Sequence, residues 1–319
     1  LFCDLKLSFE TAEQIAERTG RPLDGIEDHL IEMRQRGQIF GADFGGTMIF
    51  KMVPWAFGIY EFQFPHLDRE MAEMCNEYMK IWGDQFFRIK PQFMQVVPVE
   101  KEIQGKQTAL PYEQVSNIIE NSQSFAVFDC ICKKEKHLLD NGCEKPLEIC
   151  TAYAPFPGVF DENPSYRALS KEEAYAVLNK AEDAGLVHLT WNMESGHFFI
   201  CNCCGCCCHV LTSINDLGIN ASDVINSNYY AEIDADSCTI CNTCVDERCQ
   251  VDAIVEGDDA NYIIREKCIG CGLCVSTCPT ESIKLIRKDS EEIISPPKDE
   301  IEWYLNRANE VGTDIRKYT

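Results

Sequence analysis

The sequence predicts a multidomain α+β protein, and three observations along its 319 residues support this class. A helix-turn-helix pattern followed by a strand-turn-strand pattern opens the chain. A cysteine-rich segment in the middle combines an amphipathic helix with two strand-like runs. Near the C-terminus, two similar cysteine runs are each followed by a short apolar piece, which indicates an internal duplication. The regions expected from these patterns are 1–60, 61–110, 111–228, 229–290 and 291–319.

The composition favours metal-bound thiolates over disulfides. Small secreted scaffolds are rich in cysteine because they lack a core, but this chain has 20 cysteines, is 45% hydrophobic and can build one. We therefore expect a cytoplasmic protein. No secretory leader is visible, and no run of ~20 apolar residues predicts a membrane span. The formal net charge of −23 disfavours nucleic acid and favours basic faces of protein partners.

The N-terminal region predicts two helices followed by a strand pair. "TAEQIAERTGRPLDGIEDHLIEMRQRGQIF" has helical spacing on both sides of "TGRP", and "GADFGGTMIFKM" has a strand-turn-strand pattern. The expected common core is Ile15, Ala16, Ile26, Leu30 and Met33. Residues 1–60 resemble a winged helix-turn-helix domain. The second helix is acidic, for example at Glu27 and Asp28, which favours a protein contact over DNA binding.

The connector, residues 61–110, is predicted to be helical and extended, and it is rich in aromatic residues and methionine. Such a stripe usually belongs to a core or an interdomain seam, and the alternative is a binding surface for a partner subunit. Cys75 lies alone in a predicted helix, where we expect it to serve packing.

The middle region, residues 111–228, is predicted to be a mixed α/β, metal-binding domain with ten cysteines. Cys130 and Cys132 form a C-x-C pair at the end of a β-like run. Cys143 and Cys150 flank "EKPLE", which we expect to be a turn leading into a helix. The other six lie in "CNCCGCCC": Cys201, Cys203, Cys204, Cys206, Cys207 and Cys208.

A helix and a hairpin are expected between these two groups of cysteines. Ser170 and Glu173 form a capping box at the start of the helix, and Gly185 is suited to end it. "LVHLT" and "HFFIC" then predict a hairpin around "NMESG". The hairpin would deliver the six cysteines of "CNCCGCCC" to one place beside the Cys130 group.

Ten sulfurs in the middle region leave several kinds of metal site open. Two [4Fe–4S] clusters would use eight of them; a single cluster or an unusual larger cluster comes next, and zinc comes last. His209 is expected to be a polar neighbour rather than a ligand. Lys133, Lys134 and Lys136 follow the C-x-C pair, either as a solvated basic patch or as charges that offset a cluster or guide a carrier.

The C-terminal cysteine runs predict two interlocked [4Fe–4S] clusters. "CIGCGLCVSTCPT" matches the bacterial ferredoxin pattern C-x2-C-x2-C-x3-C-P, in which three close cysteines hold one cluster and the fourth crosses to the other. One expected ligand set is Cys238, Cys241, Cys244 and Cys278. The other is Cys268, Cys271, Cys274 and Cys249. Two structural zinc sites are the disfavoured alternative.

The first run, "CTICNTCVDERCQ", departs from the ferredoxin pattern in two ways. Four residues separate Cys244 from Cys249, and Gln250 stands where proline is usual. We therefore expect the two clusters to differ in reduction potential. Residues 229–290 are predicted to be a dicluster ferredoxin-like domain, and residues 291–319 a C-terminal docking tail.

The chain resembles a family of 4Fe-4S binding proteins common in anaerobic bacteria and archaea. The segments that carry the resemblance are "VVPVEKEI", "LPYEQVSNII", "DCICK", "CEKPLEIC", "SKEEAYAVLNKAEDAGLVH", "ICNCCGCCC" and the two cysteine runs. They cover most of the chain after Val53. The resemblance implies cytoplasmic electron transfer beside larger redox enzymes. Lys133 stands where the family usually has arginine.

Low-potential electron transfer through several [4Fe–4S] clusters is the leading functional hypothesis. The protein would be a relay or an electron-transfer subunit of a larger anaerobic oxidoreductase, and no catalytic residue is assigned. Because no dinucleotide fingerprint or P-loop is visible, flavin or nicotinamide chemistry would belong to a partner, expected to be a flavin- or metal-containing oxidoreductase subunit. A homo-oligomer is compatible with this hypothesis. The alternatives are an iron-sulfur redox sensor that regulates transcription and a reductase with its active site at Cys201–Cys208.

Overall fold

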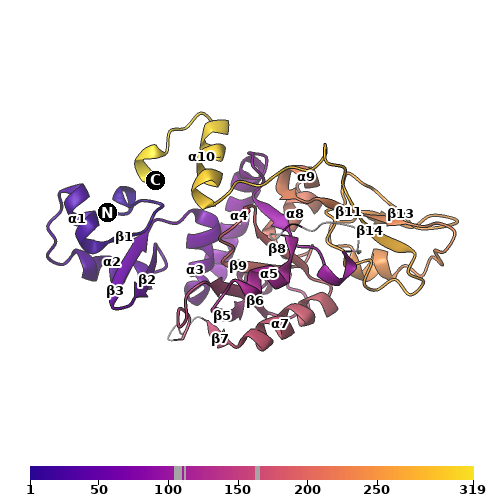
Figure 1. The fold of residues 1–319 in the computed structure, drawn as a ribbon, viewed down its shortest axis with the longest axis horizontal. Helices are drawn as coiled ribbons and strands as arrows, with labels where there is room; N and C mark the ends of the chain where they lie inside the picture. The colour runs from indigo at the N-terminus through magenta and orange to yellow at the C-terminus, as the bar shows by residue number, and fades with distance from the viewer. Residues whose placement is uncertain (104–109, 111–112, 162–165) are drawn as a thin grey trace. The chain divides into compact units, whose positions relative to one another are not determined.

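The computed structural model describes residues 1–103, 110, 113–161 and 166–319, and it divides into two compact units (Figure 1). Residues 1–68 and 308–319 form the first unit, and residues 69–307 form the second. The chain combines helices with several sheets, in agreement with an α+β class. The finer division into five regions stays a prediction. Its boundary between residues 110 and 111 lies beside residues that the structure does not describe.

The first unit contains two helices and a three-stranded antiparallel sheet. Strand β3 (Thr47–Lys51) pairs with both β1 (Glu10–Thr11) and β2 (Phe40–Phe44). Helices α1 (Ala12–Thr19) and α2 (Ile26–Gln35) precede the hairpin of β2 and β3. The predicted order of helix, turn, helix and strand pair is therefore confirmed. The assignment of this unit to winged helix-turn-helix domains stays a prediction.

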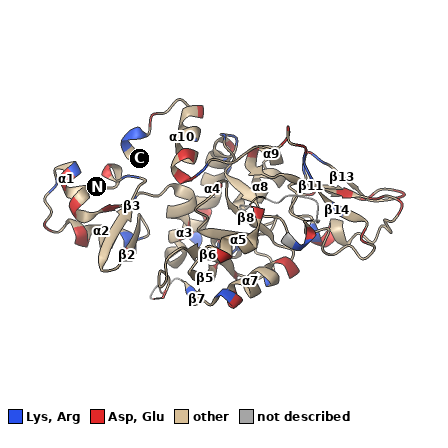
Figure 2. Cartoon of the chain, in the orientation of Figure 1, with Lys and Arg blue, Asp and Glu red and all other residues tan. Residues whose placement is uncertain are grey.

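Local signals explain where α1 begins and how the unit packs. The Thr11 hydroxyl accepts a hydrogen bond from Gln14 N, and the Gln14 side chain accepts one from Thr11 N, which is a capping box. The predicted core residues are buried in one cluster: Ile15, Ala16, Ile26, Leu30 and Met33. Glu27 and Asp28 on α2 are exposed, and Figure 2 shows the acidic character of this helix. Short helical turns complete the unit: η1 (Phe2–Asp4), η2 (Trp55–Ile59), α3 (Tyr60–Phe62), η3 (Phe64–His66) and η7 (Arg316–Tyr318).

A seven-stranded sheet lies at the centre of the second unit, in the order β10-β4-β8-β9-β6-β5-β7. Its strands are β4 (Met94–Val96), β5 (Ser124–Asp129), β6 (Glu148–Ala154), β7 (Arg167–Leu169), β8 (Val187–Trp191), β9 (Phe199–Cys203) and β10 (Ile225–Asn226). Neighbouring strands are antiparallel, except that β10 and β4 run parallel. The order brings segments that are distant in the sequence to adjacent positions.

Helices surround this sheet (Figure 1). They are α4 (Arg69–Phe86), α5 (Val115–Glu120), α6 (Ile131–Leu138), α7 (Lys171–Asp183), α8 (His209–Asn215), α9 (Ala221–Val224) and α10 (Glu300–Glu310), with the short turn η4 (Glu100–Glu102). Helix α7 packs against β5, β6 and β7, whereas α4 contacts α6 and α8. Within the described part of the chain, no helix is both long and apolar enough to cross a membrane.

The predicted helix and hairpin of the middle region are confirmed. Helix α7 begins at the capping box of Ser170 and Glu173, and Gly185 follows its end with φ of +68°. Strands β8 and β9 form the hairpin, with Val187 opposite Cys203 and Leu189 opposite Cys201. The hairpin therefore leads the chain directly into "CNCCGCCC".

One expectation for the middle region is wrong. The segment that follows "EKPLE" is strand β6 and not a helix, and Cys150 on this strand pairs with Phe128 on β5. Cys143 lies in the loop before β6. Long-range pairing with β5 and β9 determines the conformation of this segment, and such pairing leaves no local signature in the sequence.

Part of the aromatic connector belongs to the core of the second unit. Cys75 is buried on α4, as expected, and burial raises the pKa of its thiol to about 11. Trp82 stacks on Phe86 with ring centroids 4.1 Å apart, and Phe93 packs against Trp303 of α10. The core interpretation therefore holds for Phe87 and Phe93, whereas Met74, Tyr78 and Ile81 on α4 are exposed.

Two small sheets follow the seven-stranded one. Strand β11 (Tyr229–Ile233) pairs antiparallel with β14 (Ile283–Arg287), and β12 (Ile254–Val255) pairs antiparallel with β13 (Tyr262–Ile263). The first cysteine run contains the helical turn η6 (Cys244–Arg248) and is followed by β12, as the second run is followed by β14. The repeated order of run and strand agrees with the duplication seen in the sequence.

Candidate metal centres

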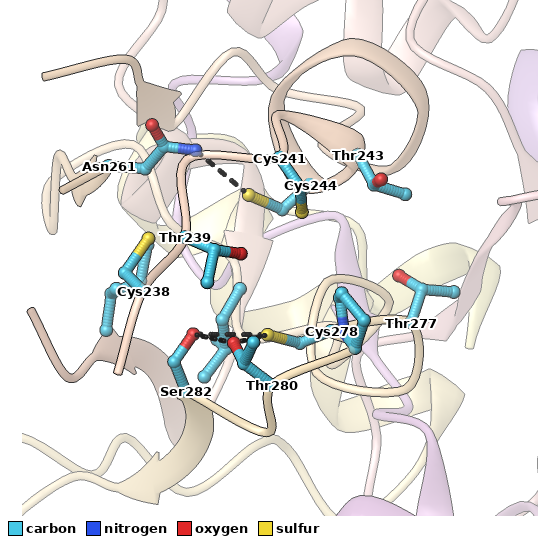
Figure 3. A pocket seen from close by; sticks show the side chains of 13 residues that line it. Cys238, Thr239, Cys241, Thr243, Cys244, Asn261, Thr277, Cys278, Thr280 and Ser282 are labelled. Carbon is cyan, nitrogen blue, oxygen red and sulfur yellow. Dashed lines mark hydrogen bonds between the residues drawn. The ribbon is translucent and has the colours of Figure 1, made fainter. Parts of the chain in front are cut away.

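The structure brings the first cysteine run together with the last cysteine of the second run. Cys238, Cys241, Cys244 and Cys278 line one pocket (Figure 3). The chain between the two runs folds back through β13, so that Cys278 reaches the other three although 33 residues separate it from Cys244. The interlocked ferredoxin pattern assigns these four cysteines to one cluster, and that assignment stays a prediction.

Polar side chains approach the sulfurs of this pocket. Asn261 Nδ2 donates a hydrogen bond to Cys244 Sγ at 3.6 Å, and the hydroxyls of Ser282 and Thr280 lie 3.1 and 3.6 Å from Cys278 Sγ (Figure 3). Burial opposes ionisation of Cys278, but the hydrogen bonds from Ser282 and Thr280 lower its pKa to about 7. Donors of this kind stabilise thiolates and tune the potential of a bound cluster.

The remaining cysteines of the two runs form a second group: Cys249, Cys268, Cys271 and Cys274. Burial raises the pKa of Cys271 to about 12. Burial also raises the pKa of Cys274, and the neighbouring thiols of Cys271, Cys268 and Cys249 raise it further. Backbone N–H groups donate to two of the sulfurs, from Ala253 to Cys249 at 3.1 Å and from Ala231 to Cys268 at 3.4 Å.

Both groups of four fit a cluster better than a single ion. A single ion needs ligand atoms that lie close together. Among the described residues, none of these eight sulfurs belongs to a group of three or more ligand atoms that all lie within 4.8 Å of one another. In a [4Fe–4S] cluster each thiolate binds a different iron, so its ligands must stand apart around a larger volume. In neither group of four do three sulfurs lie within 4.8 Å of one another, so neither is spaced for a single ion, and the assignment of one cluster to each group stays a prediction.

The two groups differ in their access to solvent. Cys241 of the first group is exposed, whereas Cys274 of the second is buried and Cys249, Cys268 and Cys271 are partly buried. Each group also has one buried member, Cys244 in the first and Cys274 in the second. The second group also touches the connector, because Val99 N donates to the Cys271 carbonyl at 2.9 Å. Of the two groups, the first is therefore the one with an exposed cysteine.

Gln250 connects the second group to the "CNCCGCCC" loop. Its side-chain Oε1 accepts a hydrogen bond from Gly205 N at 2.9 Å, and its backbone carbonyl accepts one from Asn215 Nδ2 at 3.0 Å. A Cβ at Gly205 would lie 2.2 Å from the Gln250 carbonyl oxygen, so only glycine permits this approach. Because Gln250 follows Cys249 directly, two cysteine-rich segments meet at this contact.

Arg248 makes a second connection from the same run. Its guanidinium is buried and donates to the carbonyls of Glu182 and Asp183, at the C-terminal end of α7, at 2.9 and 3.1 Å. It also donates to the Leu273 carbonyl at 3.2 Å. Arg248 belongs to the four residues between Cys244 and Cys249, so both departures from the ferredoxin pattern carry contacts to the middle region. The departures are visible in the sequence, whereas the contacts that they make are not.

The ten middle cysteines divide into a group of four and a group of six. The group of four is Cys143, Cys204, Cys206 and Cys207, whose sulfurs all lie within 4.8 Å of one another. In the group of six, side-chain interactions with two other thiols of the group shift the pKa of each thiol, and these links close a ring. The order around this six-thiol ring is Cys130, Cys132, Cys208, Cys203, Cys201 and Cys150, which returns to Cys130.

Secondary structure positions each member of the six-thiol ring. Cys130 precedes α6 and Cys132 lies in its first turn, while Cys150 is on β6. The other three come from the end of β9 and the start of α8: Cys201, Cys203 and Cys208. The pKa of Cys130 lies well below its ordinary value because Cys132 and Cys150 hydrogen-bond to it. A thiolate is the form that binds metal.

Lys133 lies fully buried beside both groups of middle cysteines. Its ammonium donates to the Asn202 carbonyl at 3.2 Å. Burial alone would lower the pKa of Lys133, but the nearby thiols of Cys130, Cys150 and Cys204 raise it above its ordinary value. The interpretation of the lysines as a solvated basic patch is therefore wrong for Lys133. Lys136 is partly buried and donates to Asn76 Oδ1 at 2.9 Å.

His209 has a carboxylate partner in the structure. Its Nε2 lies 3.1 Å from Glu135, and both side chains are buried. This pairing agrees with the expected role of His209 as a polar neighbour. Cys3 of the first unit is exposed and takes no part in either group of middle cysteines.

The C-terminal region also resembles known proteins. Residues 261–284 match the family described as "4Fe-4S binding domain", and this segment contains the second cysteine run. A ferredoxin from Rickettsia felis is 39% identical over 69 residues, which are 21% of this chain and 62% of that protein. A ferredoxin from Streptomyces griseus is 41% identical over 51 residues, which are 14% of this chain and 49% of that protein.

For a third relative, the matched region covers a larger share of that protein's length than for the other two. A ferredoxin from Alicyclobacillus acidocaldarius is 43% identical over 63 residues, which are 20% of this chain and 72% of that protein. The chain spans less than two thirds of the length of the ferredoxins from Rickettsia felis and Streptomyces griseus. These likenesses support iron-sulfur electron transfer by the C-terminal region.

Proposed function

Because this chain belongs to the ferredoxin family through its C-terminal region, we propose that it relays single electrons at low potential within a larger oxidoreductase system. When bound, iron-sulfur clusters accept and release one electron at a time. One [4Fe–4S] cluster would be held by Cys238, Cys241, Cys244 and Cys278. The other would be held by Cys249, Cys268, Cys271 and Cys274.

The role of this chain's residues is to position the clusters and set their potentials. Asn261 and Ser282 approach the sulfurs of the first cluster, whereas backbone N–H groups and burial surround the second. Hydrogen bonds to sulfur favour the reduced, more negative state, and burial disfavours it. The two clusters would therefore differ in potential, with the first one open to an electron-carrying protein.

The six-thiol ring is proposed to hold a further iron-sulfur cluster. Six thiols are more than one four-iron cluster needs, so the ring suits a larger or differently coordinated cluster. The buried ammonium of Lys133 would offset part of its negative charge. Electrons would enter as one-electron equivalents from a reduced carrier protein and leave to an oxidised flavin- or metal-containing partner.

The contact between Gln250 and Gly205 is the observation that carries the relay proposal. It joins a residue next to Cys249 to the loop between Cys204 and Cys206. A hydrogen-bonded, close-packed contact offers a short route between the second ferredoxin cluster and the middle cysteines. An isolated ferredoxin domain would not require glutamine in place of the usual proline at this position.

The proposed electron-transfer route through the contact of Gln250 with Gly205 can be tested by substitution. The substitutions exchange the residues that follow the fourth cysteine of each run. We expect Gln250→Pro to slow reduction of the middle cluster several-fold, because the hydrogen bond from Gly205 N is lost. The matched control is Pro279→Gln, which makes the reverse change after Cys278. Rapid-freeze electron paramagnetic resonance after mixing with a reductant measures the rate. Equal rates in both variants and the natural protein would contradict the route.

A reductase is the second candidate, because the six-thiol ring has more thiols than a single four-iron cluster uses. In that case the middle cluster would be the site of substrate reduction rather than a relay. Turnover of a small substrate by the isolated full chain, supplied with an artificial electron donor, separates the two functions. The transcription-regulator hypothesis has less support, because α2 exposes acidic residues such as Glu27 and Asp28.

A further inference from the structure

Four middle cysteines are close enough to share one metal ion. The sulfur of Cys143 lies 3.9 Å from that of Cys204 and 3.6 Å from that of Cys207, and the sulfurs of Cys206 and Cys207 are 3.7 Å apart. All four sulfurs lie within 4.8 Å of one another. In the ranges that the structure describes, no other group of three or more Cys, His, Asp or Glu side chains is this compact.

These separations match the edges of a tetrahedron around a single ion. Zinc–thiolate bonds of about 2.3 Å place the corners of a tetrahedron about 3.8 Å apart. A [4Fe–4S] cluster needs more widely spaced thiolates, because each binds a different iron. We propose that Cys143, Cys204, Cys206 and Cys207 bind one zinc ion, separately from the iron-sulfur clusters.

Zinc suits this ligand set better than a redox metal. Four thiolates close the coordination sphere of zinc, and such closed sites are structural rather than catalytic. Cys206 is exposed while Cys204 and Cys207 are buried, so the ion would lie at the edge of the domain with no position left for a substrate. Carboxylate and carbonyl ligands, which magnesium and calcium prefer, are not part of the group.

The zinc ion would hold the "CNCCGCCC" loop in place. Cys204 and Cys207 bind the ion, while their outer neighbours Cys203 and Cys208 belong to the six-thiol ring. The Cys208 N–H donates to the Cys204 carbonyl at 3.2 Å, which makes the loop a tight turn. Cys143 ties this turn to the segment before β6. The ion therefore sets the spacing of two ring thiols without belonging to the ring.

The same loop carries Gly205, which contacts Gln250. A zinc ion that holds the loop would thus also maintain the surface against which the second cysteine run lies. This role is structural and does not depend on whether electrons use the contact.

Metal analysis of the full chain tests the proposal. Protein purified anaerobically with a chelator present, to remove loosely held metal, should retain one zinc per chain beside its iron. Zinc-edge X-ray absorption should show four sulfurs at about 2.3 Å. This measurement needs no variant, so it remains decisive if a substituted protein fails to fold. Absence of stoichiometric zinc, or a mononuclear iron in its place, would overturn the zinc assignment.

Two cysteine variants locate the ion. Cys206→Ser changes the exposed member of the group and should remove most of the zinc while iron and acid-labile sulfide stay unchanged. Cys201→Ser changes the six-thiol ring and should lower iron while zinc stays. Cys3→Ser, at an exposed cysteine in the other unit, should change neither. Loss of several irons and sulfides from Cys206→Ser, without loss of zinc, would show that the four thiols belong to a cluster.

Discussion

Lys133 is a buried cation whose neighbours are thiols. A charged ammonium without exposure is stable only with opposite charge or strong hydrogen bonds nearby. The Asn202 carbonyl supplies one hydrogen bond, and thiolates of both middle groups supply negative charge. Lys133 is therefore suited to balance metal–thiolate charge inside the domain, a role that a residue of the same charge could also fill.

Removing this charge should affect a middle cluster directly. We expect Lys133→Met to lower the reduction potential of the middle cluster by on the order of 59 mV, a tenfold change for a one-electron couple. The reason is that an added electron would no longer be balanced by the buried ammonium. Lys133→Arg should restore most of the potential. A redox titration followed by electron paramagnetic resonance measures the shift.

Lys134→Met is the matched control, because it removes the same charge from a side chain that is less buried. Its effect on the potential should be much smaller, since solvent screens an exposed charge. Equal shifts in Lys133→Met and Lys134→Met would mean that overall charge, rather than the buried ammonium, sets the potential.

At the scale of elements, the end of α7 is joined to the first cysteine run. The last carbonyls of a helix lack intrahelical partners, and Arg248 supplies donors to those of Glu182 and Asp183. Lys145 Nζ adds a hydrogen bond to the Ala184 carbonyl at 2.6 Å. The helix that packs on β5, β6 and β7 is thus also a contact point for the C-terminal sheets.

Arg248→Leu should weaken this junction strongly. It removes three hydrogen bonds from a buried guanidinium, each worth about 1.5–3 kcal/mol, so we expect the free energy of unfolding to fall by about 4.5 kcal/mol or more. Urea unfolding under anaerobic conditions measures the change. The control Arg265→Leu breaks an exposed ion pair with Glu292 and should cost about 0–1 kcal/mol. If both variants lost a similar free energy of unfolding, Arg248 would contribute no more to stability than an exposed ion pair does.

At the scale of the whole molecule, the cysteines of the second unit form a graded series. The series runs from the exposed Cys241, through the partly buried group around Cys274, to the six-thiol ring, whose members are buried or partly buried. Such an order gives the proposed relay an open end and a buried end. The net charge of −23 would favour a partner with a basic face.

The metal content of the full chain should reflect this series. Anaerobically purified protein is expected to contain more than about eight irons per chain, since two [4Fe–4S] clusters account for about eight and the six-thiol ring adds its own. Cys150→Ser should lower the iron content toward that of the two clusters, whereas Cys75→Ser, at a packing residue, should not. Iron and acid-labile sulfide analysis measures both. A natural protein with eight irons or fewer would leave no cluster for the ring.

Local patterns in the chain predicted much of this organisation. The capping box of Ser170, the stop at Gly185 and the hairpin that ends at Cys203 depend on neighbours a few residues away. The C-x2-C-x2-C spacing from Cys268 is a local signal too, because a short loop can supply ligands only to neighbouring irons of one cluster. The prediction for the segment around Cys150 was wrong because strand pairing with β5 outweighs local preference.

The division of the ten middle cysteines could not be read from their order along the chain. Cys203 and Cys204 are adjacent in sequence, yet one belongs to the six-thiol ring and the other to the compact group with Cys143. Which way each side chain points depends on where β5, β6, β9 and α8 meet, and that in turn depends on packing across the whole sheet. Arg248 and Gln250 likewise stand out in the sequence only as departures from a pattern. Their partners, α7 and Gly205, come from segments more than 40 residues away and meet them only in the folded chain.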